Sequence, residues 1–279
     1  MVCPIDACLP WLWSGMPILR PLLLQFPTDG GTRQIVDEWL LGPDLLVAPA
    51  GVGSATGKAD TLARDIYFPG ESQSQLWYSY WDASTATAVR GGATRTVPTP
   101  VNYAPLYVRG GAVMAMLAEQ QLGLAADVEE GTTEQEQEHG LHVIVALSHP
   151  ETGTASGTLF IDDGVSVYDG NVPHATAPRL LVNFEAATRR LVSNPDAAHS
   201  SLLSVEAAAF PTVVNTVTIF GVGIGITEIM LSTLGPSGSP VHTRVIPNAD
   251  YTWDPATGVL SVTKLRQTMT APWALEWTI

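Results

Sequence analysis

The chain has 279 residues, of which 46% are hydrophobic and 14% are charged, so it holds enough apolar material to fold around a core and does not have the composition of a disordered chain. Its 13 Lys and Arg against 27 Asp and Glu give a formal net charge of −14, which excludes a basic surface suited to nucleic acid or anionic lipid. With only Cys3 and Cys8, the sequence can build neither a disulfide framework nor a four-cysteine zinc site. At roughly 150 residues per domain, the length favours two domains.

The first 42 residues predict one strand followed by one helix. Ile18–Phe26 is an apolar run bounded by prolines, which favours a buried strand. Thr32–Leu41 carries apolar residues at helical spacing and ends at Gly42, which favours a helix. Residues 1–24 are apolar, but Asp6 and several prolines interrupt them and no Lys or Arg precedes them, so they make a poor signal peptide.

From Asp44 onward the pattern changes to short β segments separated by turn residues, which is typical of β-sandwiches. The predicted strands are Leu45–Ala48, Ile66–Phe68, Leu76–Trp81, Leu106–Val108, Leu141–Leu147, Thr158–Ile161, Arg179–Phe184, Val217–Phe220, Val259–Thr263 and Ala274–Ile279. Leu141, Val143, Val145 and Leu147 fall on one face of their strand, and Leu275, Trp277 and Ile279 on one face of the last. Val213–Leu231 is long enough to span a membrane, but its Val, Thr and Ile content favours a pair of buried strands.

The segment from Glu119 to His139 carries seven acidic residues and no Lys or Arg, which indicates an exposed linker. The sequence therefore divides into residues 1–42, a first sandwich at 43–118, an acidic linker at 119–136 and a second sandwich at 137–279.

The motifs that could carry chemistry are weak. Gly53–Lys58 lacks the spacing and the Ser or Thr of a phosphate loop, and Gly221, Gly223 and Gly225 are not followed by a helix, so they indicate a bend. His139 and His142 are expected to be solvated, and Asp162-Asp163-Gly164 is more typical of a hairpin turn than of paired acid and base. We predict no catalytic, cofactor-binding or metal-binding residue in this chain.

Several longer motifs follow one another along the chain. They are Gly15-Met-Pro17-Ile-Leu-Arg20-Pro-Leu-Leu-Leu-Gln-Phe26-Pro27-Thr-Asp29, Asp37-Glu-Trp-Leu-Leu-Gly42-Pro-Asp-Leu45-Leu46-Val47-Ala48-Pro49, Ile66-Tyr-Phe-Pro69-Gly70, Leu76-Trp77-Tyr78, Ala104-Pro105-Leu106-Tyr107-Val108-Arg109-Gly110-Gly111, Gly157-Thr-Leu-Phe-Ile-Asp162-Asp163-Gly164-Val-Ser166 and Val217-Thr-Ile-Phe-Gly221-Val. In this order they resemble the C-terminal third of family 31 glycoside hydrolases, the α-glucosidase group. The resemblance runs from about residue 15 to the end, and it implies that residues 1–42 hold the last strand and helix of a (β/α)₈ barrel before two β-sandwich domains.

The resemblance also implies what this chain lacks. Enzymes of this family retain configuration and need an aspartate nucleophile and a second carboxyl group, both on barrel strands upstream of the region matched here. The family's nucleophile motif is roughly Trp-x-Asp-Met-Asn-Glu, whereas Trp81-Asp82 and Trp253-Asp254 have the wrong residues after them. No catalytic residue is carried over, and the chain alone is expected to be inactive.

The sequence thus predicts the C-terminal portion of an α-glucosidase-type hydrolase that supports the catalytic barrel. The resemblance implies two partners. One is an α-glucoside substrate, bound only when the full barrel is present. The other is the catalytic barrel itself, which the apolar residues of segment 11–42 are expected to need for burial; no cofactor, nucleic acid or membrane span is predicted. The resemblance and the acidic composition favour the secretory pathway. The alternative is a free-standing carbohydrate-binding or scaffold protein that stacks Trp77, Tyr78, Tyr80 and Trp81 on sugar rings.

Overall fold

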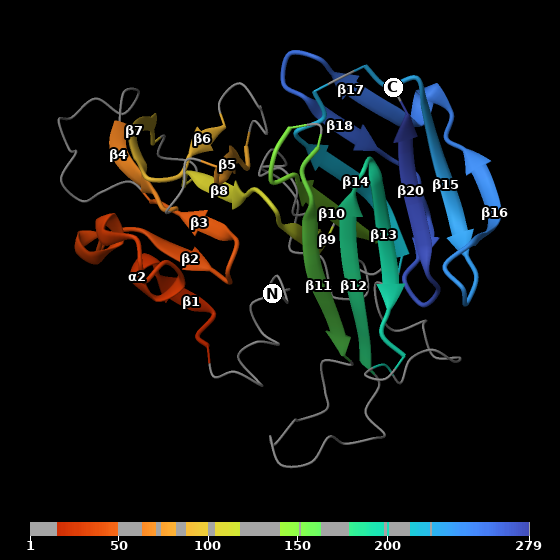
Figure 1. Ribbon diagram of the computed structural model, residues 1–279, viewed down its shortest axis with the longest axis horizontal. Helices are drawn as coiled ribbons and strands as arrows, with labels where there is room; N and C mark the ends of the chain where they lie inside the picture. Colours follow the sequence, from red (N-terminus) through yellow and green to blue (C-terminus); the bar gives the residue numbers. More distant parts are fainter. Residues whose placement is uncertain are drawn as a thin grey trace, which may run out of the picture.

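The computed structural model describes residues 16–49, 63–70, 74–81, 88–99, 104–117, 140–150, 152–162, 179–197, 200, 213–223 and 225–278. These residues form two groups of β-sheets side by side, as Figure 1 shows, and the mainly β fold predicted from the sequence is confirmed. Within these ranges there is no helix of the length and apolarity needed to cross a membrane.

The first group is built on a six-stranded sheet in the order β1-β2-β3-β8-β5-β6. Its strands are β1 (Leu19–Pro21), β2 (Trp39–Leu41), β3 (Leu45–Val47), β8 (Leu106–Arg109), β5 (Leu76–Ser79) and β6 (Val89–Arg90). A two-stranded antiparallel sheet of β4 (Ala63–Phe68) and β7 (Ala93–Pro98), the β4–β7 pair, packs against this sheet. Phe68 of the β4–β7 pair and Tyr107 of the six-stranded sheet meet edge to face, with ring centroids 4.6 Å apart, inside a shared apolar core.

The strand and helix predicted in residues 17–42 are wrong in detail. Ile18–Phe26 is the short strand β1 followed by one helical turn, α2 (Leu22–Gln25). Thr32–Leu41 is divided between a 3₁₀ helix, η2 (Gly30–Gln34), and strand β2. Because β2 pairs with both β1 and β3, tertiary hydrogen bonding overrides the helical spacing of its apolar residues. Strand β2 ends before residue 42 and pairs with β3 after it, so backbone hydrogen bonds cross the boundary that the sequence predicts at residue 42.

The second group is a sandwich of two six-stranded sheets. One has the path β17-β18-β14-β10-β9 with β19 beside β14, and the other the order β11-β12-β13-β20-β15-β16. The strands are β9 (Val113–Leu117), β10 (Leu141–Ala146), β14 (Val213–Phe220), β17 (Tyr251–Asp254), β18 (Val259–Val262) and β19 (Gln267–Thr268), and then β11 (Ala155–Asp162), β12 (Arg179–Ala187), β13 (Arg190–Pro195), β20 (Trp273–Thr278), β15 (Glu228–Leu234) and β16 (Pro240–Val245). A short 3₁₀ helix, η6 (Asn248–Asp250), precedes β17.

Alternation along the strands fills the sandwich core as the sequence predicts. Leu141, Val143, Val145 and Leu147 all enter one apolar cluster, which Leu275 and Trp277 join from the opposite sheet. The run Val213–Leu231 does contain two buried strands, β14 and most of β15, but they lie in different sheets and do not pair with each other. Gly221 (φ 95°) lies in the connection after β14, in a backbone conformation that favours glycine.

Strand β9 connects the two groups of sheets. It follows the first group in sequence, yet it pairs with β10 at the edge of the second. Residues 118–139, which hold the acidic segment, lie outside the described ranges; they follow β9 and precede β10, and these two strands pair in one sheet. The four-part division of the chain stays a prediction.

The two groups share a further apolar cluster. Tyr78 and Val108 of the first sheet pack there against Ile144, Ala146 and Phe220 of the second group. The hydroxyl of Tyr78 donates to the carbonyl of Leu147 at 2.8 Å in a fully buried position. The two halves are thus joined through packed side chains as well as through the chain itself.

Candidate functional site

Most of the residues weighed for chemistry in the sequence lie outside the described ranges, namely Gly53–Lys58, His139, Asp163 and both cysteines. His142 was expected on the surface, but it is buried, its Nε2 lies 2.9 Å from Thr218 Oγ1, and burial lowers its pKa to about 4. Among the described residues, no group of three or more His, Cys, Asp or Glu is placed to hold a metal ion.

The aromatic strand does not present its rings to solvent. Trp77 and Tyr78 are fully buried, and the indole Nε1 of Trp77 donates to the carbonyl of Pro69 at 2.9 Å. Tyr80 and Trp81 are half-buried and pack edge to face on each other. Stacking of sugars on Trp77 and Tyr78, as the carbohydrate-binding alternative requires, is excluded by their burial.

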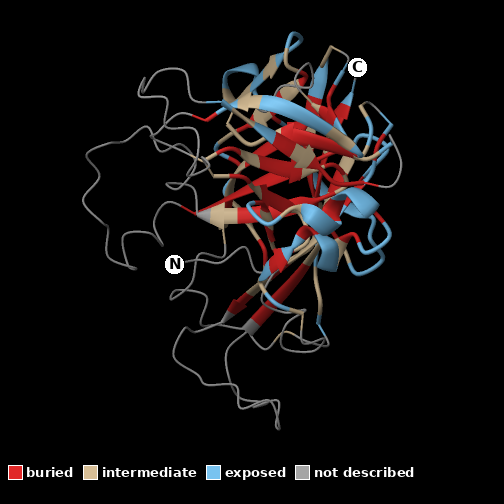
Figure 2. Ribbon diagram, turned by 90° about the vertical axis from the view of Figure 1, so that its left-hand side faces the viewer, coloured by how far each residue is buried: buried red, intermediate tan, exposed pale blue. Residues whose placement is uncertain are grey.

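The exposed feature of the first sheet is an apolar surface on β1 and α2. We define it by Leu19, Leu23 and Leu24, which are 60%, 41% and 42% exposed. In the same helical turn Leu22 is fully buried, so α2 packs one leucine inward and leaves two outward. Figure 2 shows the helical segments exposed beside strands that are buried. Burying a leucine side chain is worth about 1.5–3 kcal/mol, so this apolar surface favours contact with another apolar surface.

A buried charged cluster lies next to this apolar surface. Arg20 is 4% exposed; its Nε donates to the Pro17 carbonyl at 2.8 Å and its Nη1 to Gln25 Oε1 at 2.7 Å, while its buried Nη2 makes no hydrogen bond. Burial lowers the pKa of Arg20, against the attraction of Asp44. Burial also raises the pKa of Asp44, against the attraction of Arg109 and Arg20. A buried guanidinium with a free donor leaves room for one further acceptor.

A second polar cluster fixes the segment between α2 and β2 to the β4–β7 pair. Arg64 Nη2 lies 2.7 Å from Asp37 Oδ2 and 3.3 Å from Glu38 Oε1, and Glu38 Oε1 also accepts from the backbone N–H of Tyr67 at 2.9 Å. Burial raises the pKa of Glu38 to about 7, and its Oε2 makes no hydrogen bond.

Asp29 caps the start of η2 and holds it to the same pair of strands. Its carboxylate accepts from the N–H of Gly31, from the hydroxyl of Tyr67 at 2.6 Å and from the N–H of Gly70 at 2.9 Å. Burial acts to raise the pKa of Asp29, but these hydrogen bonds outweigh it and the pKa is lowered. The carboxylates of Asp29, Asp37 and Glu38 thus tie the segment between α2 and β2 to β4 and the residues that follow it.

Residues 15–114 match the family model of the glycosyl hydrolase family 31 C-terminal domain, a stretch that runs from before β1 into β9. An α-glucosidase of Aspergillus oryzae is 27% identical over 95% of this chain and 22% of its own length. An α-glucosidase of Hordeum vulgare is 35% identical over 55% of this chain and 15% of its own length. The chain thus spans about a fifth of these relatives.

Solved structures of the same family share the fold. The catalytic α subunit of glucosidase II superposes with a TM-score of 0.68 at 19% identity over 95% of this chain and 26% of that chain. A dextranase of Flavobacterium johnsoniae gives a TM-score of 0.59 at 17% identity, over 97% of this chain and 31% of that chain. The resemblance found in the sequence motifs is confirmed, and the region 15–114 is homologous to the α-glucosidases.

Proposed function

We propose, from the membership of residues 15–114 in the family 31 C-terminal domain, that this chain is the C-terminal portion of an α-glucosidase-type glycoside hydrolase, and that it supports the catalytic barrel and the rim of its active site. The homology to α-glucosidases and the share of those enzymes that the chain covers support this role.

The observation that carries the proposal is the exposed leucine surface on β1 and α2 beside the buried Arg20. Leu19, Leu23 and Leu24 offer an apolar contact, and Arg20 Nη2 offers a shielded donor to an acceptor of the partner. The buried core of a permanent interface is more apolar than the rest of the protein surface, and its polar groups are hydrogen-bonded. The catalytic barrel that the family resemblance implies is the partner proposed for this surface.

The chain's own contribution to hydrolysis is structural. A retaining mechanism needs two carboxyl groups about 5–5.5 Å apart, one as nucleophile and one as acid and base. The acidic residues described above accept hydrogen bonds from backbone and guanidinium groups of the fold. The chain alone is expected to hydrolyse neither maltose nor an aryl α-glucoside.

A chimera tests the role. The matched C-terminal region of the Aspergillus oryzae α-glucosidase is replaced by this chain, and hydrolysis of an aryl α-glucoside is measured beside the isolated chain. We expect activity in the chimera only. Leu23→Asp with Leu24→Asp should abolish it by opening the interface, whereas Val241→Asp, at a 74% exposed valine of β16, should not. Activity of the isolated chain that an α-glucosidase inhibitor blocks, or equal effects of the two sets of variants, would contradict the proposal.

A further inference from the structure

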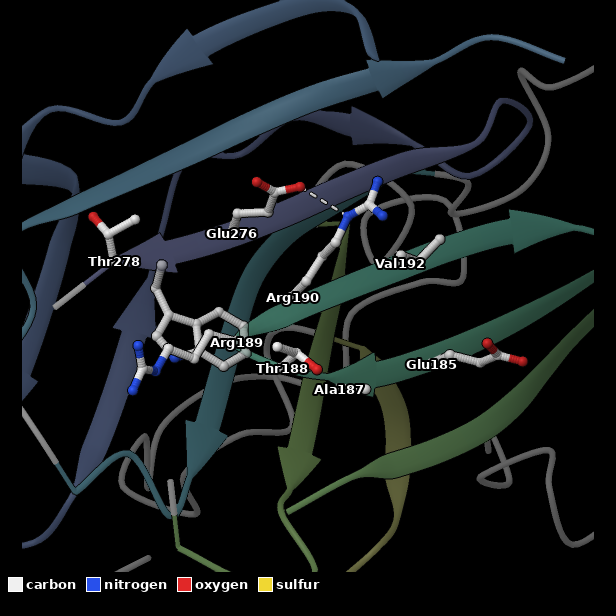
Figure 3. A pocket seen from close by; sticks show the side chains of 9 residues that line it. Glu185, Ala187, Thr188, Arg189, Arg190, Val192, Glu276 and Thr278 are labelled. Atoms are coloured by element: carbon white, nitrogen blue, oxygen red, sulfur yellow. Dashed lines mark ion pairs between the residues drawn. The ribbon is translucent and has the colours of Figure 1, made fainter. Parts of the chain in front are cut away.

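The outer face of the second sandwich carries a groove that the proposed role does not use. It has a volume of about 680 Å³, within the range of small-molecule sites. Its lining comes from β12, β13, the turn between them and the end of β20 (Figure 3). The lining residues are Glu185, Ala187, Thr188, Arg189, Arg190, Val192, Glu276, Trp277 and Thr278.

The strand register explains why charged side chains gather here. Phe184, Leu191 and Leu275 point into the sandwich core, so their neighbours Glu185, Arg190 and Glu276 point outward. Arg190 lies opposite Glu276 in the pairing of β13 with β20. Its Nε lies 2.8 Å from Glu276 Oε1, with both side chains about a third exposed, so the groove floor presents an ion pair to solvent.

The turn at the edge of the groove has an unfavourable backbone for its residues. Thr188 (φ 52°) and Arg189 (φ 62°) join β12 to β13 with both central residues in the left-handed region, where Asn-Gly is the usual pair and a β-branched residue is an outlier. The fold holds this turn in place, because the Arg189 carbonyl accepts from the N–H of Trp277 at 3.1 Å. Strain of this kind persists where the side chains it positions have a use.

The chemistry of the lining selects the class of ligand. Two arginines and two glutamates give the groove no net formal charge, so it favours neither an anion nor a cation. Guanidinium groups donate, carboxylates accept and threonine hydroxyls do both. A neutral molecule with neighbouring hydroxyl groups can accept from Arg190 and donate to Glu276 at the same time. We propose that this groove, between the β12–β13 turn and the end of β20, binds an oligosaccharide.

Titration of the full, ¹⁵N-labelled chain tests this site. The probes are maltoheptaose, cellohexaose and a linear mannohexaose, with inositol hexakisphosphate as an anionic comparison. We expect at least one glycan to give saturable amide shifts confined to residues 185–192 and 276–278, with a dissociation constant on the order of 1 mM, as is usual for a shallow sugar site. Shifts at these amides with the phosphate alone, or none with any glycan, would overturn the proposal.

Variants separate binding from folding. Thr188→Asn with Arg189→Gly installs the preferred turn, so we expect a higher melting temperature together with at least tenfold weaker binding. Glu276→Gln should weaken binding by a similar factor. Arg266→Gly, at another exposed arginine with positive φ (48°) outside the groove lining, is the matched control and should leave binding unchanged. Binding that survives both groove variants would show that the groove is not the site.

Discussion

At the scale of single residues, the buried carboxyl of Glu38 couples stability to pH. Burial raises its pKa from 4.5 to about 7, and its Oε2 makes no hydrogen bond although Oε1 accepts two. Because the folded pKa lies above the unfolded one, the protonated form is favoured in the fold. The contribution of Glu38 to the free energy of unfolding is therefore fully present below pH 4.5. It decreases as the pH rises from 4.5 to about 7 and does not change further at higher pH. The loss is on the order of 3 kcal/mol.

Glu38→Gln should remove this slope, since the amide oxygen still accepts from Tyr67 N–H and Arg64 but does not titrate. Urea unfolding of both proteins between pH 4 and 8 gives the measurement, and the difference between their unfolding free energies isolates the group. Asp37→Asn, at the exposed partner of the same arginine, is the control and should leave the slope in place. Parallel pH profiles of Glu38→Gln and the unaltered chain would show that the pKa of Glu38 is the same in the folded and unfolded states, which contradicts the prediction.

Tyr78 gives a second prediction at this scale. Its hydroxyl is the buried donor to the Leu147 carbonyl between the two groups of sheets. Tyr78→Phe leaves that carbonyl without its donor, so we expect a loss of about 1–3 kcal/mol, measured as a lower urea midpoint with an unchanged m value. Tyr80→Phe is the comparison. The hydroxyl of Tyr80 contacts the sulfur of Met116 at 3.3 Å, which is a weak acceptor. Removing this hydroxyl should lower the free energy of unfolding by less than about 0.5 kcal/mol.

At the scale of elements, α2 divides its three leucines between two roles. Leu22→Ala removes a fully buried side chain from the core shared with the β4–β7 pair and should cost about 2–5 kcal/mol. Leu23→Ala and Leu24→Ala, at exposed neighbours, should change the stability of the isolated chain by less than about 0.5 kcal/mol. Thermal unfolding of the three variants tests this. Equal losses would mean that the outward leucines are already buried by some contact within the chain.

The elements predicted correctly are those whose sequence pattern and tertiary environment agree. Val143 and Val145, or Leu275 and Trp277, alternate because one face of their strand lies in the core, and that alternation is visible in the sequence. In β2, Trp39 and Leu40 continue a helical spacing that begins at Ile35, but pairing with β1 and β3 decides their backbone. β16, whose residues are all exposed, has no apolar face that could mark it as a strand.

The candidate sites were less predictable than the fold. The outward leucines of α2 look the same in sequence as Leu22, because a single turn of helix is too short to show a period. The groove joins Arg190 to Glu276, which lie far apart in the chain and meet only through the register of β13 and β20. The family motifs identify the region, and the sequence shows no match to the family's nucleophile motif. Both results can be read from the order of residues alone, without knowing where the side chains lie.

At the scale of the whole molecule, β9 makes the two groups of sheets interdependent. Its side chains alternate between two cores: Val113 and Ala115 enter the sandwich core, while Met114 enters the cluster shared with the first sheet. Its backbone pairs with β10 from Leu117 to Val113. A break in the acidic segment between β9 and β10 would leave β9 covalently attached to the first group but packed in the second.

This arrangement predicts that cutting the chain does not separate its halves. A protease site replaces residues 124–130, and the cut protein is analysed by native mass spectrometry and gel filtration. Two independent domains joined by a linker would elute as two fragments. Because removal of β9 would expose the edge of β10 and open both cores, we expect one complex that comes apart only in denaturant.

Val113→Asp places a charge in the sandwich core at β9 and should let the cut halves separate, while Glu119→Gln should not. Separation of the unaltered halves in native buffer would mean that β9 pairs too weakly to join them.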